Sequence, residues 1–253
     1  MSKIVIRSKV GLFVQLLGVV SSYISIFLIA RFEGPASQGL FVTIKSFVDA
    51  AYALFMAGLP QALILVINRN QFNVRSAVPR VELYIVCIFL LSIPITWKFM
   101  WLDVSSSQAL AFIPVGITGM SIFALTRALL LTHTDGLFFS LFTAAPSSLI
   151  LLFVTLNIFV SKSGYLYVYF YFGITLFIIS QFVILGLYWA NRAGARMGVP
   201  FRRLFSENVH SFAQAVLYNG QLFLVLRLLH AFGVLPDDIG KISTAILPLL
   251  ALH

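Results

Sequence analysis

The sequence contains few charged residues. Asp, Glu, Lys and Arg make up only 10% of its 253 residues, whereas soluble domains carry roughly 25%. Hydrophobic residues make up 60%, and they fall in repeated runs of about 20 residues, which is the length that crosses a bilayer. The shortage of charge therefore excludes an ordinary soluble fold. It predicts an all-α integral membrane protein, a polytopic transmembrane helix bundle.

Cysteine is almost absent, and the histidines are scattered. The single cysteine, Cys87, lies within an apolar run, and one cysteine forms neither an intrachain disulfide nor a CxxC metal site. The four histidines form no HExxH motif and have no cysteine partner. We therefore expect no metal site.

Motifs for nucleotide binding and for glycan chemistry are also lacking. The stretch 237–243 resembles the end of a P-loop, but Leu235 and Ile242 stand where that loop needs Gly and Ser or Thr. No nucleophile elbow occurs, and the outer loops are short for a glycan polymerase or ligase, which needs a large outer loop. The sequence predicts no enzyme activity and no cofactor.

Basic residues outnumber acidic ones by 17 to 8, which gives a net charge of +9. No basic patch with interleaved aromatic residues stands outside the apolar runs, so we expect no nucleic acid partner. Instead, Lys and Arg gather at the N-terminus, in the loop from Arg69 to Arg80 and in residues 191–208. The loops on the other side receive only Arg31, Lys98 and Lys162. The positive-inside rule then places the N-terminus and residues 191–208 in the cytoplasm.

The apolar runs predict seven spans, with an eighth run that stops early. The seven are roughly Val10–Ala30, Leu40–Ile67, Val81–Trp97, Ala109–Leu131, Leu137–Val160, Tyr165–Ala190 and Val209–Leu229. The run from Lys241 to His253 is too short to cross at about 1.5 Å per residue. We predict an N-terminal six-helix lobe (1–190), a cytoplasmic basic inter-lobe loop (191–208) and an incomplete start of a second lobe (209–253). The aromatic run at Tyr165 is typical of a belt at a membrane interface.

Small and polar residues line one face of the first predicted span. They recur at steps of four and three residues, which places them on one side of a helix: Gly11, Gln15, Gly18, Ser22 and Ser25. Such a face either packs closely against another helix or lines an internal cavity, and the sequence leaves both interpretations open.

Charges and helix breakers stand inside the predicted spans. Lys45 and Asp49 are four residues apart in the second span, where they form an ion pair or line a cavity. Gly58 and Pro60 predict a hinge in the same helix. Two further cations, Arg127 and Arg227, either extend to the interface or face a cavity. Lys and Arg suit an anionic substrate with phosphate groups.

One stretch resembles a known family. The pattern LIAR, Gly34-Pro35, Gly39-Leu40-Phe41 and then GLPQALI from Gly58 to Ile64 resembles the N-terminal part of Wzx-type polysaccharide flippases. These flippases belong to the MOP superfamily, which includes the MATE multidrug exporters. The resemblance implies two six-helix lobes that face each other across a central cavity. It also implies export of undecaprenyl-diphosphate-linked oligosaccharide by alternating access across the bacterial cytoplasmic (inner) membrane, for O-antigen of lipopolysaccharide or for capsule.

The resemblance also implies a site and partners. Arg31, Lys45 and Arg127 in the first lobe, with Arg227 at the start of the second, would hold the diphosphate and the sugars. The expected partners are the lipid-linked oligosaccharide, membrane lipids, a polysaccharide polymerase and the chain-length machinery. Two alternatives remain open: a cation-coupled multidrug exporter of the same fold, with Asp49 as the coupling carboxylate, and an inactive fragment that lacks most of the second lobe.

Overall fold

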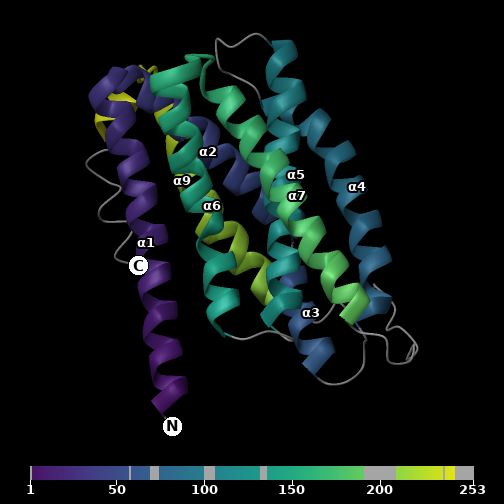
Figure 1. The fold of residues 1–253 in the computed structure, drawn as a ribbon. Coiled ribbons are helices and arrows are strands. Elements are labelled where there is room, and N and C mark those ends of the chain that lie inside the picture. The colour runs from purple at the N-terminus through teal and green to yellow at the C-terminus, as the bar shows by residue number, and fades with distance from the viewer. Residues whose placement is uncertain are drawn as a thin grey trace.

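The computed structural model describes residues 2–56, 58–68, 74–99, 106–131, 136–190, 209–235 and 237–242. Within these ranges all regular structure is helical, and six helices are long and apolar enough to cross a membrane. The chain is therefore an all-α, multi-pass membrane helix bundle, as the shortage of charge predicts (Figure 1).

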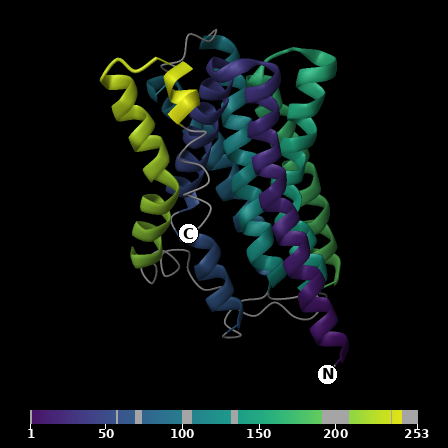
Figure 2. The same ribbon diagram turned by 90° about the vertical axis from the view of Figure 1, so that its left-hand side faces the viewer.

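The helices run up and down through the bundle. They are α1 (Ser2–Phe32), α2 (Gly34–Met56), α3 (Leu59–Asn68), α4 (Val74–Phe99), α5 (Ser106–Leu131), α6 (Gly136–Leu156), the π-helical turn η1 (Asn157–Ser161), α7 (Tyr165–Ala190) and α9 (Val209–Ala231). In space α1 lies along α6, and α5 lies along α7. Figure 2 shows α9 at the edge of the bundle, where it packs on α2. The predicted loop 191–208 and residues 243–253 lie outside the described ranges.

The turn between α1 and α2 is tight, as the Glu33-Gly34-Pro35 sequence predicts. α2 begins at Gly34, six residues before the approximate start predicted for the second span at Leu40. Gly34 has a φ of 86°, a left-handed conformation that ends the preceding helix at little cost for glycine. Pro35 follows in the first turn of α2, where its missing N–H is not needed. A single residue, Glu33, therefore separates the two helices.

The second predicted span is two helices. α2 ends at Met56 and α3 begins at Leu59, with Gly58 between them at a φ of 76°. Pro60 lies in the first turn of α3, so it costs no hydrogen bond there. The hydroxyl of Tyr84, from α4, donates a hydrogen bond to the Phe55 carbonyl at the end of α2. The break therefore leaves that carbonyl satisfied.

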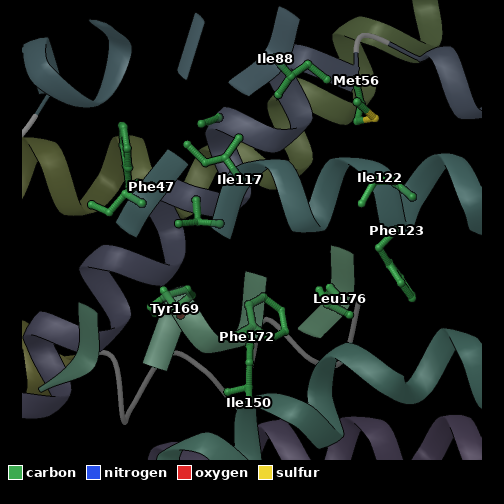
Figure 3. Packing of buried hydrophobic residues seen from close by; sticks show 14 of the residues in the cluster. Phe47, Met56, Ile88, Ile117, Ile122, Phe123, Ile150, Tyr169, Phe172 and Leu176 are labelled. Atoms are coloured by element: carbon green, nitrogen blue, oxygen red, sulfur yellow. The ribbon is translucent and has the colours of Figure 1, made fainter. Parts of the chain in front are cut away.

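The centre of the bundle is α5. In its most apolar stretch 72% of the residues are buried, against 22% for α1. Glycines bring α5 and α7 into backbone contact, because a Cβ atom on Gly119 would lie 2.4 Å from the Gly173 carbonyl oxygen. Small residues at a helix interface allow this kind of approach in a membrane. Figure 3 shows side chains of α2, α5 and α7 meeting in the resulting core.

The small-residue face of α1 packs on α6. Gly11 and Gly18 are buried, and Cβ atoms built on them would meet Ser140 and Ala144 at 2.7 and 3.3 Å. For these two glycines the close-packing interpretation holds. Gln15, by contrast, is exposed.

The seventh predicted span forms the helix α9, and its second half, Gly220–Ala231, is apolar. Phe223 of α9 contacts Phe47 of α2, with ring centroids 5.5 Å apart. A helical segment, 237–242, follows. A Cβ atom on its Gly240 would lie 2.0 Å from the Pro35 carbonyl oxygen, so this segment rests against the start of α2.

Candidate functional site

A polar face runs along α2. Lys45, Asp49 and Tyr52 follow one another at steps of four and three residues, which places them on one side of the helix. We call these three residues the α2 polar face. Phe41 lies on the same side, four residues before Lys45. Phe41 contacts Tyr165 and Tyr169 of α7, with ring centroids 5.4 and 5.7 Å apart. The α2 polar face is therefore turned toward α7, inside the bundle.

Lys45 and Asp49 form an ion pair on this face. The Lys45 Nζ donates to Asp49 Oδ2, and the two side chains are 33% and 27% exposed. A charged side chain at membrane depth is costly unless it has a partner. Each charge therefore offsets the cost of the other.

Further polar groups lie within electrostatic reach of this pair. The Asp49 carboxylate interacts electrostatically with the hydroxyls of Tyr52 and Tyr169, and the Arg127 guanidinium interacts electrostatically with the Tyr52 hydroxyl. Tyr169 is 1% exposed, and its hydroxyl has no hydrogen-bond partner among the described residues. A buried polar group left without a partner costs about 1–3 kcal/mol. The Tyr169 hydroxyl is thus a donor and acceptor that a ligand could satisfy.

Two of the predicted cavity cations lie apart from the ion pair. Arg31 is exposed in the last turn of α1. The ion pair lies deeper, since α2 descends about 16 Å from Gly34 to Lys45 at ~1.5 Å per residue. Arg227 lies on α9, four residues after Phe223 and on the same helix face. Phe223 contacts Phe47, which lies about 200° around α2 from Lys45.

The structure therefore groups only some of the predicted site. Lys45 and Asp49 are in contact, and the Arg127 guanidinium interacts electrostatically with Tyr52 of the same α2 polar face. The guanidinium carbon of Arg127 lies 5.4 Å from the centroid of the Phe139 ring of α6, and its side chain is exposed. Arg31 lies nearer the end of the bundle, and Arg227 lies on the face of α9 whose Phe223 contacts Phe47. Gly58 and Pro60 lie at the break that follows α2.

Sequence reasoning missed the two tyrosines of the site. Tyr52 could have been found, because it continues the helical period of Lys45 and Asp49. Tyr169 belongs to the aromatic run that the sequence assigned to a membrane-interface belt. Tyr165 and Tyr169 of this run are buried, and both contact Phe41 of α2. The Tyr165 hydroxyl donates to Glu33 Oε2 at 2.6 Å, and it thereby ties the start of α7 to the turn between α1 and α2.

A further missed residue is Glu82 of α4. Its Oε2 accepts a hydrogen bond from Gln181 Nε2 of α7 at 2.9 Å. It lies inside the candidate span Ala77–Lys98, so Asp49 is not the only carboxylate within a span. Across the described part of the chain, no three His, Cys, Asp or Glu side chains gather closely enough to hold a metal ion.

Comparisons of the chain with protein-family models, with curated proteins and with solved structures gave no match.

Proposed function

We propose that the chain is a flippase, or the N-terminal portion of one, for undecaprenyl-diphosphate-linked oligosaccharide. It acts in the bacterial cytoplasmic membrane, with its N-terminus in the cytoplasm, in polysaccharide biosynthesis. The observation that carries the proposal is the α2 polar face inside a membrane span. Ionisable residues at such positions mark substrate or ion pathways. The resemblance to Wzx-type flippases covers this same helix.

The chemistry of the α2 polar face suits an anionic headgroup. The Lys45 ammonium has three N–H donors and binds phosphate as a point charge. A diphosphate that enters the bundle competes with Asp49 for this ammonium. The hydroxyls of Tyr52 and Tyr169 are then available to phosphate oxygens or sugar hydroxyls. With the N-terminus in the cytoplasm, Arg127 lies near the cytoplasmic end of α5. Lys45, at the midpoint of α2, lies farther from the cytoplasm, so the headgroup meets Arg127 first.

A glycan-export assay tests the role of Lys45. A strain that lacks its flippase is supplied with a full-length protein carrying this N-terminal portion, and surface glycan is measured. We expect Lys45→Ala to abolish export and Lys45→Arg to retain most of it, because Arg also binds phosphate. Lys98→Ala is the matched control, since Lys98 is an exposed cation at the end of α4.

A double variant separates substrate binding from structure. If Lys45 serves only to neutralise Asp49, removing both charges relieves the unpaired carboxylate, and Lys45→Ala/Asp49→Ala regains export. If Lys45 holds the diphosphate, the double variant stays inactive. Regained export in the double variant, or no surface glycan from the unmodified protein, contradicts the proposal.

A further inference from the structure

A polar contact joins α4 and α7 within the membrane-spanning part, away from the α2 polar face. Gln181 Nε2 donates to Glu82 Oε2 at 2.9 Å. Two helical turns away, the Arg75 guanidinium carbon lies 4.8 Å from the centroid of the Tyr188 ring. The order of the contacts is opposite on the two helices, so α4 and α7 run antiparallel here. Glu82 lies about 7 Å into its span, which begins at Ala77.

The Glu82 carboxyl has an amide for a partner rather than a cation. In the described part of the chain, Lys45 pairs with Asp49, and Lys241 pairs with Asp237 and Asp238. The second oxygen of Glu82, Oε1, is buried and has no hydrogen-bond partner among the described residues. A carboxylate at this depth is costly without a positive charge beside it. The buried oxygen therefore points to a cation that binds there.

The surroundings of Glu82 favour a proton over a metal ion. Ca²⁺ takes about six to eight oxygen ligands, and no cluster of acidic or His side chains surrounds Glu82 within the described ranges. A proton needs a single oxygen. The other charged or titratable side chains on this half of α4 and on the helices packed against it are Arg75, Arg80, Tyr84 and Cys87 of α4, Arg127 of α5 and Tyr188 of α7.

Three of these groups are engaged elsewhere. Tyr84 donates to the Phe55 carbonyl, Arg75 lies over the Tyr188 ring, and Arg127 lies over the Phe139 ring. The Oε1 atom of Glu82 has no donor among the described residues.

We propose that Glu82 is a proton-binding site between α4 and α7. A proton from water on one side of the membrane adds to Oε1, which turns the carboxylate into a neutral acid, and the same proton leaves to water when the two helices rearrange. Asp49 does not take this role, because Lys45 already neutralises it. Protonation of Glu82 is independent of the proposed function, whereas its coupling to export rests on that function.

Infrared spectroscopy of the full chain in lipid bilayers tests the protonation. The chain has only eight Asp and Glu residues, so the C=O stretching band of a protonated carboxyl is traceable through a pH series. We expect a membrane-embedded carboxyl band that is present in the unmodified chain and in the control Asp49→Asn and is missing in Glu82→Gln. An unchanged band in Glu82→Gln overturns the proposal.

A second variant keeps the test decisive if Glu82→Gln fails to fold. Gln181→Leu removes the amide that donates to Glu82 and leaves the carboxyl in place. We expect the frequency of the same band to change, because that frequency depends on the hydrogen bonds of the carboxyl. A band with unchanged frequency in Gln181→Leu overturns the proposal.

Transport measurements then test the coupling. A full-length protein carrying this portion is placed in proteoliposomes with a lipid-linked oligosaccharide and a pH gradient. We expect Glu82→Gln to lose the dependence of flipping on the gradient, while the control Asp238→Asn, which changes an exposed carboxylate outside the α2 polar face, keeps it. If the unmodified protein flips nothing, the proposed function fails while the infrared result stands. If Glu82→Gln flips with the same gradient dependence as the unmodified protein, the coupling role of Glu82 is refuted.

Discussion

The contact between α5 and α7 makes a quantitative prediction for Gly173→Ala. The added Cβ atom would lie 2.4 Å from the Val115 carbonyl oxygen and 2.8 Å from the Gly116 Cα atom. Both are backbone atoms, so no side chain can rotate away. Ordinary contacts need roughly 3.5 Å, so the two helices must move apart by about 1 Å. Overpacking of this kind costs about 1–3 kcal/mol.

The matched control is Gly186→Ala on the same helix, because a Cβ atom there meets nothing within 4 Å. Both variants gain about 0.5–1 kcal/mol from replacing a helical glycine with alanine. The difference in unfolding free energy between the two variants therefore reports the contact between α5 and α7 alone. We expect Gly173→Ala to be less stable than Gly186→Ala by about 1–3 kcal/mol. Unfolding of the purified chain in bicelles, followed by circular dichroism, measures this. Equal midpoints for the two variants would refute the close approach of α5 and α7.

Two further predictions concern the contact between α7 and the α1–α2 turn and the contact between α2 and α9. Tyr165→Phe removes the hydrogen bond to Glu33. We expect the free energy of unfolding to fall by about 1 kcal/mol in the same assay, because Glu33 is exposed and its bond competes with water. An unchanged free energy of unfolding contradicts a structural role for this bond. In a Cys87→Ser background, Phe47→Cys and Phe223→Cys should cross-link with a short bis-maleimide, since their rings are 5.5 Å apart. Failure of the pair to react while each single cysteine is labelled would show that α9 does not pack on α2.

Much of the fold follows from local sequence signals. The apolar runs and the shortage of charge predict helices of membrane-crossing length. Gly34 directly precedes Pro35 and Gly58 stands two residues before Pro60, and a glycine and a proline so close together mark a break between helices. The ion pair of Lys45 and Asp49 is equally local, since four residues separate its members. These features depend on neighbours within one or two helical turns, so a single sequence contains the information.

The remaining features depend on which helices meet. Nothing in the aromatic run reveals that Tyr169 is buried against α2, because that requires α7 to lie beside α2. The hydrogen bond between Glu82 and Gln181 joins residues far apart in the chain, and its signal is a single carboxylate near the end of a span. The separation of Arg227 from Lys45 follows from the side of α2 on which α9 packs. These pairings are set by tertiary packing, which helical periodicity does not encode.

The break at Gly58 separates two helical registers. A residue inserted into α3 would rotate the part of α3 that follows by about 100° and would leave every side chain of α2 in place. The same insertion between Lys45 and Asp49 would turn the carboxylate away from the ammonium and shift the rest of α2 against α5. Length changes should therefore be tolerated after the break far better than before it. A scan of single-residue insertions along residues 40–68 would locate the boundary between the two behaviours.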